Sequence, residues 1–136
     1  MGELERLAIQ RAARDAAWPK LCHVTVNTQT GEIADVTEPA AALFGYTSDE
    51  LHGQSVEILV PELIRPQHAT WRQDAKAPET RLMGVGREVS GQRKDGSLIR
   101  VHVGLTIYPC LERMFATAVI IDTTGIQLTR TVEVKP

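Results

Sequence analysis

The spacing of hydrophobic residues changes near the start of the chain, where a helical period gives way to an alternating one. Residues 3–18 contain no Gly or Pro and are rich in Ala, Leu, Glu and Arg, which predicts a helix. Its apolar side is a narrow stripe at helical spacing, formed by Leu4, Leu7, Ala8, Ala12 and Ala16. A stripe made mostly of alanine packs weakly against its own domain, so we expect it to suit a partner helix.

Strand-like alternation begins after Cys22. Residues 23–26 alternate and are rich in β-branched side chains, residues 27–31 supply turn chemistry, and residues 33–36 resume the strand pattern. The pair predicts a β-hairpin.

Short helices are predicted next. Pro39 suits the first position of a helix that Gly45 ends. Thr47 or Ser48, followed by two acidic residues, is an N-cap with charges that the helix dipole favours. Residues 62–77 are also compatible with a helix, and Pro66 requires the regular part to begin near Arg65.

The remainder of the chain predicts β-structure. Residues 81–92 are an extended run, residues 94–97 form an Asp-Gly hairpin turn, and residues 99–107 alternate as a strand with one buried face. Residues 114–121 are apolar on both faces at their end, which favours a central strand. This order predicts an α+β domain whose helices cover one face of an antiparallel sheet.

Composition limits the classes of function. The 136 residues fit one domain, and a net charge of −2 gives no general attraction to nucleic acid or to an anionic membrane. The chain has no apolar run of the ~20 residues that span a bilayer, and its charged N-terminus is not a signal peptide. Cys22 and Cys110 lack zinc-like spacing and suit buried, reduced thiols. We therefore expect a cytoplasmic protein.

Catalytic motifs are not found. The three histidines at positions 23, 52 and 102 lack metal-ligand spacing. The serines show no nucleophile elbow, and Gly84 and Gly86 are not followed by a third glycine or a helix start. We expect a protein without enzymatic activity of its own.

Four motifs in order resemble the PAS family over about residues 22–124. They are residues 31–33, 41–54, 93–97 and 122–124. The resemblance implies a PAS fold, in which a five-stranded antiparallel sheet cups short helices and ligands bind in the cup. It divides the chain into an N-terminal flanking helix at 1–20, a PAS domain at 21–124 and a tail or extra strand at 125–136.

Residues 59–68 are similar to a segment of the haem-binding PAS domains of bacterial oxygen sensors. The resemblance implies that His68 is the proximal iron ligand, a role that neutral imidazole suits. It places the arginine that contacts bound oxygen or a haem propionate at Arg87, and Arg72 or Arg81 as a further propionate partner. The implied apolar distal wall consists of Leu82, Met83, Val103 and Leu105.

Other interpretations remain open at this point. Many PAS domains carry a histidine in this segment without holding haem. Trp71 could stack on a flavin, although a large apolar residue of this kind also suits a core position. No cysteine stands where a flavin photo-adduct would need it.

Three hypotheses follow from these observations. The first is a sensory input module with haem as the leading ligand, which forms a homodimer through residues 3–18 and the outer sheet face or signals to a partner in trans. The second is a cofactor-free interaction domain. The third is a flavin-based redox sensor.

Overall fold

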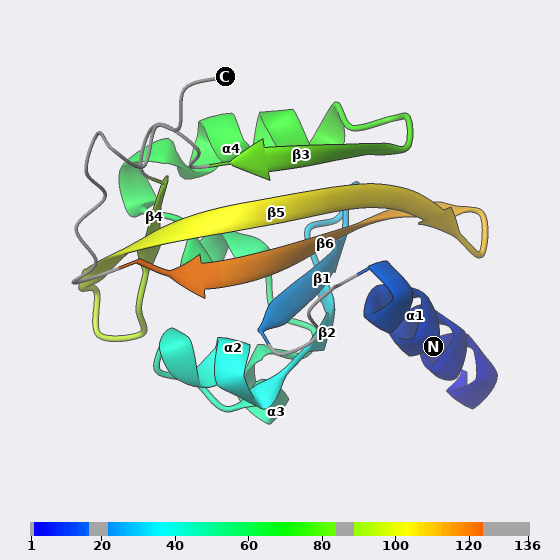
Figure 1. Ribbon diagram of the computed structural model, residues 1–136, viewed down its shortest axis with the longest axis horizontal. Coiled ribbons are helices and arrows are strands. Elements are labelled where there is room, and N and C mark those ends of the chain that lie inside the picture. Colours follow the sequence, from blue (N-terminus) through cyan, green and yellow to red (C-terminus); the bar gives the residue numbers. More distant parts are fainter. Residues whose placement is uncertain (1, 17–21, 84–88, 124–136) are drawn as a thin grey trace, which may run out of the picture.

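The computed structural model describes residues 2–16, 22–83 and 89–123. An N-terminal helix precedes a β-hairpin, a helical segment and a second group of strands (Figure 1). The elements are α1 (Glu3–Ala16), β1 (His23–Asn27), β2 (Ile33–Val36), α2 (Glu38–Leu43), α3 (Ser48–Leu51), η1 (Val56–Leu59), η2 (Glu62–Ile64), α4 (Arg65–Gln73), β3 (Glu79–Met83), β4 (Val89–Gln92), β5 (Leu98–Cys110) and β6 (Arg113–Asp122). The predicted tail or extra strand at 125–136 lies outside the described residues.

The strands form one antiparallel sheet in the order β2-β1-β6-β5-β3, and β4 also pairs with β5. β3 pairs with residues 103–107 of β5, and β4 pairs with residues 98–101 of the same strand. The fifth position of the sheet is therefore shared by two strands, whereas the sequence predicted one extended run from 81 to 92. The predicted α+β class and the central place of β6 are confirmed.

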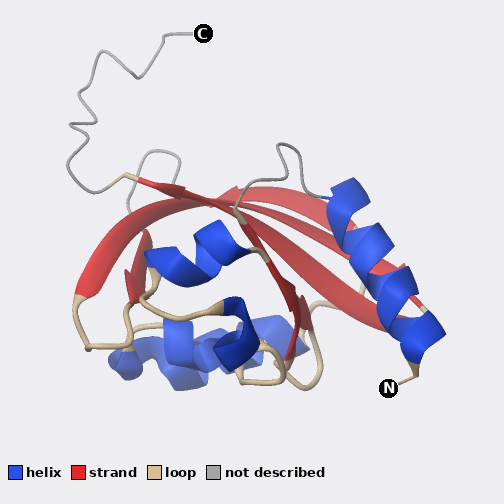
Figure 2. Ribbon diagram, turned by 90° about the horizontal axis from the view of Figure 1, so that it is seen from below, coloured by secondary structure: helices blue, strands red, loops and turns tan. Residues whose placement is uncertain are grey.

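Helices α2, α3 and α4 lie beneath the concave face of the arched sheet (Figure 2). Strand alternation explains this layer, because Val24, Val26 and Ile107 point to one face and are buried in the core. Phe44, the C-cap of α2, and Leu51 of α3 pack against these strand residues.

Local chemistry accounts for the short elements. The Thr47 side chain accepts from Glu50 N while the Glu50 carboxylate accepts from Thr47 N, which is a complete capping box at the start of α3. Pro66 lies in the first turn of α4, so that the helix begins at Arg65 as predicted. The turn between β4 and β5 uses Gly96 at a φ of 90°.

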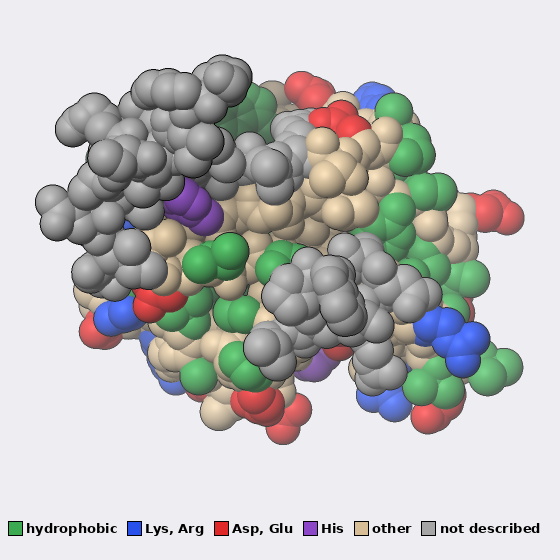
Figure 3. Space-filling model, in the orientation of Figure 1, with side chains coloured by type: hydrophobic (Ala, Val, Ile, Leu, Met, Phe, Trp, Pro, Cys, Tyr) green, Lys and Arg blue, Asp and Glu red, His purple; other side chains and the backbone are tan. Residues whose placement is uncertain are grey.

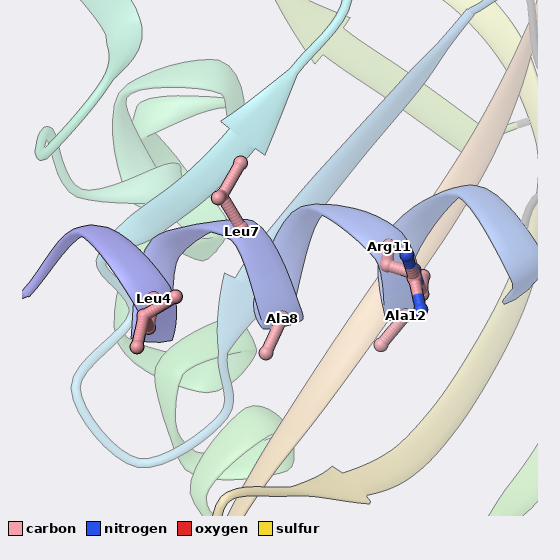
Figure 4. Close-up of a pocket in the computed structure, with 5 residues that line it drawn as sticks. All are labelled: Leu4, Leu7, Ala8, Arg11 and Ala12. Carbon is pink, nitrogen blue, oxygen red and sulfur yellow. The ribbon is translucent and has the colours of Figure 1, made fainter.

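Helix α1 packs against β2 and β5, on the face of the sheet opposite the other helices (Figures 2 and 4). Over residues 3–13, the part of α1 whose side chains are described, the buried residues are Ile9 and Ala13, one helical turn apart, which the sequence analysis did not single out. Leu4 and Leu7 of the predicted stripe remain 81% and 49% exposed. The two leucines of the stripe are therefore largely uncovered in this chain.

Candidate functional site

The candidate site lies in the helical segment that runs from η1 to α4. The hydroxyl of Ser55 caps η1 by accepting from Glu57 N at 3.2 Å, and the Arg65 side chain donates through Nε to the Val60 carbonyl at 2.8 Å. These bonds fix η1 relative to the start of α4, because the arginine closes the turn between them. They also bring Glu57 and His68 together, although eleven positions separate these residues in the sequence.

His68 is held by a carboxylate. Its Nδ1 lies 2.8 Å from Oε1 of Glu57, and the two side chains are 30% and 17% exposed. A carboxylate accepts at this distance, so the imidazole Nδ1 is the donor. In a neutral imidazole, this arrangement leaves the lone pair on Nε2, to which no described residue bonds.

Arg72 holds the same carboxylate from the other side. Its Nε donates to Oε2 of Glu57 at 3.0 Å, and its Nη1 donates to the Thr28 carbonyl at 2.8 Å. The Arg72 side chain is only 8% exposed. Gly31 permits this placement, since a Cβ at that position would lie 2.8 Å from the guanidinium carbon.

The hydrogen bonds continue from Arg72 into the sheet. Thr28 follows β1, and both its backbone N and its hydroxyl donate to the Met114 carbonyl of β6, at 3.0 and 3.3 Å. A chain of polar contacts therefore joins His68 of α4, through Glu57 and Arg72, to the end of the central strand. Arg72 is 8% exposed and uses Nε and Nη1 in this chain, which argues against Arg72 as the propionate partner and leaves Arg81 as the other candidate that the resemblance offered.

The predicted distal wall is described only in part. Val103 and Leu105 lie on the core face of β5 and are half-buried. Met83 pairs in register with Val103, whereas Leu82 pairs with Gly104, one position out of phase with the two wall residues. The side chains of Arg81, Leu82 and Met83 and the whole of Arg87 lie outside the described residues, so the roles predicted for them remain predictions.

Trp71 does not occupy the core. Its side chain is 54% exposed on α4, so the interpretation of Trp71 as a core residue is wrong. The reason is that α4 buries none of its residues, whereas the large core side chains come from the segment of α2 and α3, from η1 and from the strands. The idea that Trp71 stacks on a flavin stays a prediction.

The two ends of the cup differ. Near α2 and α3, Phe44, Leu51 and Leu59 are 6% exposed or less and fill the space against the sheet. By contrast, Val103 and Leu105 on the core face of β5 are only half-buried. The core is therefore packed more tightly around Phe44, Leu51 and Leu59 than at these two positions of β5.

A second polar cluster was missed by the sequence analysis. His23 Nε2 lies 3.1 Å from Oδ2 of Asp35, and His52 Nε2 lies 4.0 Å from the other oxygen of that carboxylate. The His23 side chain is 2% exposed, and its Nδ1 is buried without a partner among the described residues. The pairing of β1 with β2 brings His23 and Asp35 together, and His52 comes from the end of α3, so sequence spacing gave no signal. Within the described part of the chain, no group of three or more His, Cys, Asp or Glu could hold a metal ion.

The cysteines differ slightly from expectation. Cys22 and Cys110 are free thiols, but both are half-buried rather than buried. Burial, together with the nearby Asp122 carboxylate, raises the pKa of the Cys22 thiol. This thiol is therefore a poor nucleophile, which agrees with a structural role.

Comparison with known proteins identifies the family. The PAS domain family model matches residues 21–125, so the chain belongs to the PAS family. Among solved structures, the PAS domain of an HTR-like protein from Haloarcula marismortui has a TM-score of 0.64 and 20% identity, and the match covers 84% of this chain and 90% of that one. This likeness confirms the PAS fold.

Relatives of known description include sensor proteins. The oxygen sensor protein DosP of Escherichia coli is 26% identical over 69% of this chain, and the sensor protein FixL of Bradyrhizobium diazoefficiens is 34% identical over 48%. A probable serine/threonine-protein kinase of Dictyostelium discoideum is 38% identical over 61%. The matched regions are 12%, 13% and 6% of these proteins, respectively. The chain is thus similar to a sensory domain within much longer proteins.

One further finding concerns membranes. None of the helices in residues 2–16, 22–83 and 89–123 is long and apolar enough to cross a bilayer.

Proposed function

We propose that this PAS domain is a cytoplasmic signal-input module, without enzymatic activity of its own, that binds haem in its cup through His68. The observation that carries the proposal is the hydrogen bond of 2.8 Å between His68 Nδ1 and Glu57. Histidines that bind metals donate their second ring nitrogen to a carboxylate, a carbonyl or water in nearly all cases. His68 has this arrangement, with Nε2 left for the iron.

The residues around His68 fit a haem ligand. A single imidazole satisfies the protein side of a haem iron, so the lack of a larger metal cluster among the described residues does not conflict with the proposal. When bound, haem supplies an iron that takes up diatomic gases. The chain would hold the iron through His68 and exclude polar competitors with Val103 and Leu105. The similarity to an oxygen sensor protein supports a gas as the signal.

The signal would leave the cup through the sheet. Arg72 links the helical segment to the β1–β2 turn, and Thr28 links that turn to β6. A ligand that prefers one of two packings of α4 would shift the population of the sheet arrangement in the same sense. The outer sheet face, on which hydrophobic and polar side chains are mixed, would present the change to a second copy or to a partner protein in trans (Figure 3).

A second candidate is a cofactor-free dimerisation domain. The exposed side of α1 favours it, because Leu4, Leu7, Ala8, Arg11 and Ala12 line a hollow on the surface of the helix (Figure 4). We propose a second copy of this chain as its occupant, since a self-complementary apolar helix face is the simplest two-fold interface. A flavin-based redox sensor has weaker support, as it depends on the half-exposed Trp71.

The visible spectrum of the purified protein, before and after addition of hemin, tests these proposals. We expect a sharp absorption band near the violet edge, and we expect His68→Ala to abolish it while the far-ultraviolet circular dichroism stays unchanged. His52→Ala is the matched control, because it removes an imidazole that follows α3 and is 39% exposed, and it should keep the pigment. If the His68→Ala variant retains the pigment, His68 is not the residue that binds the iron. Blue absorption with green fluorescence indicates flavin, and a colourless dimer favours the interaction domain.

A further inference from the structure

Glu57 divides its carboxylate between two partners. Oε1 lies 2.8 Å from His68 Nδ1, and Oε2 lies 3.0 Å from Arg72 Nε. The Glu57 side chain is 17% exposed, so solvent screens these contacts less than it would screen surface pairs.

We propose that Glu57 is the positioning residue of His68 and tunes it as an iron ligand, and that Arg72 sets how much carboxylate charge reaches the imidazole. This inference rests on the proposed haem-binding function and assigns opposite effects to the two residues. Nothing in the sequence pattern marks Glu57, because it belongs to η1 whereas His68 belongs to α4.

The effect of Glu57 follows from hydrogen-bond chemistry. A carboxylate that accepts from Nδ1–H fixes the tautomer and the ring orientation, and it increases the electron density at Nε2. A more basic imidazole stabilises ferric iron over ferrous iron, so the midpoint potential of a bound haem falls. Loss of the negative charge should therefore raise this potential.

The effect of Arg72 has the opposite sign. Its guanidinium draws charge from the same carboxylate through Oε2, and the Thr28 carbonyl holds it in place. Without the arginine, the carboxylate would interact more strongly with His68. Loss of Arg72 should therefore lower the potential, although it breaks the same ion pair as a change at Glu57.

The experiment measures hemin affinity and midpoint potential for Glu57→Gln and Arg72→Met. Gln retains the shape of Glu57 and removes its charge, so we expect a higher potential, a weaker iron–histidine stretch in resonance Raman spectra and about 10-fold weaker hemin binding. For Arg72→Met we expect a lower potential and a stronger iron–histidine stretch. Glu62→Gln is the control, since it removes the same charge from exposed η2, where the carboxylate bonds to neither His68 nor Arg72.

A purely structural role would move both variants in one direction, because both lose the Glu57–Arg72 pair. The inference would be overturned if the midpoint potentials of Glu57→Gln and Arg72→Met shifted in the same direction, or if both equalled that of Glu62→Gln. Haem binding would still be established in either case. If Glu57→Gln fails to fold, Arg72→Met still decides, because the inference requires its potential to fall below that of the wild type while the potential of Glu62→Gln stays unchanged. A wild-type protein that binds no hemin refutes the proposed function, and the role of Glu57 with it.

Discussion

Gly91 of β4 lies directly against the ring of Phe44 at the end of α2. A Cβ built on Gly91 would be 2.6 Å from Cε1 and 3.2 Å from Cζ of Phe44, closer than side chains approach one another in folded proteins. Phe44 is 3% exposed and has little room to move. The helical layer and β4 are therefore in direct contact at this position.

Gly91→Ala should destabilise the domain by about 1–3 kcal/mol, because overpacking forces neighbours out of their preferred rotamers. Urea unfolding followed by circular dichroism measures the change. Gly2→Ala is the control, as a Cβ at Gly2 meets nothing within 4 Å. Phe44→Leu in the Gly91→Ala background should recover part of the lost stability. If Gly91→Ala is as stable as Gly2→Ala, the neighbouring side chains accommodate the added methyl group without cost, and the expectation is wrong.

Elements with local causes could be predicted from the sequence. The start of α4, the cap of α3 and the Asp-Gly turn depend on residues within a few positions of one another, and each agrees with the structure. The division of the fifth sheet position between β3 and β4 could not be predicted, since it depends on how each pairs with β5. The buried face of α1 was also missed, because the choice between Ile9 and the Leu4 stripe is made by the sheet.

The candidate site shows the same limit. Resemblance to a family identified His68, but its partner Glu57 belongs to another element, and no sequence spacing connects them. The resemblance offered Arg72 or Arg81 as a propionate partner, because an arginine near a haem segment suits that role. Its burial and its bond to Thr28 follow only from the packing of α4 against the β1–β2 turn.

Asp35→Ala should destabilise the domain, because it removes the side-chain partner of the buried His23. The other ring nitrogen of His23 is already buried without a partner among the described residues, so the imidazole would lose its remaining side-chain bond. A buried polar group left unsatisfied costs about 1–3 kcal/mol. Chemical unfolding at neutral pH measures the loss.

The matched control for Asp35→Ala is Asp74→Ala, which removes an exposed carboxylate after α4 and should change stability little. A double-mutant cycle with His23→Leu isolates the pair, since Asp35→Ala should cost much less when the imidazole is absent. Additive losses would show that the two side chains are not energetically coupled.

Tyr108 should limit stability at alkaline pH. Burial raises the pKa of Tyr108 above its usual value of 10.0, although its hydrogen bond of 2.7 Å with the Thr117 hydroxyl lowers the pKa in part. In the unfolded chain the phenol loses its proton at lower pH, so this contribution to stability is present below about pH 10 and is lost as pH rises further. Tyr108→Phe should therefore flatten the alkaline fall in stability.

Unfolding free energies between about pH 8 and about pH 11 check this expectation. Tyr108→Phe should also cost about 1 kcal/mol at neutral pH through the lost hydrogen bond. Cys22, whose pKa is also raised, titrates in the same direction, so Cys22→Ala serves as the comparison variant. If the unfolding free energy falls as steeply at alkaline pH in Tyr108→Phe as in the wild type, another group is responsible for the fall.

Leu7→Glu should lower the mass of the protein in solution if α1 forms the dimer contact. Deletion of residues 1–18 should also lower the oligomeric state, but it uncovers the sheet surface that Ile9 and Ala13 bury. Leu7→Glu leaves these contacts in place and puts a charge on the exposed stripe, where it would be desolvated in a dimer. Leu63→Glu is the control, because Leu63 is 95% exposed on η2, away from α1. Light scattering that gives the same mass for Leu7→Glu, Leu63→Glu and the wild type would remove α1 from the dimer surface and leave the outer sheet face as the alternative.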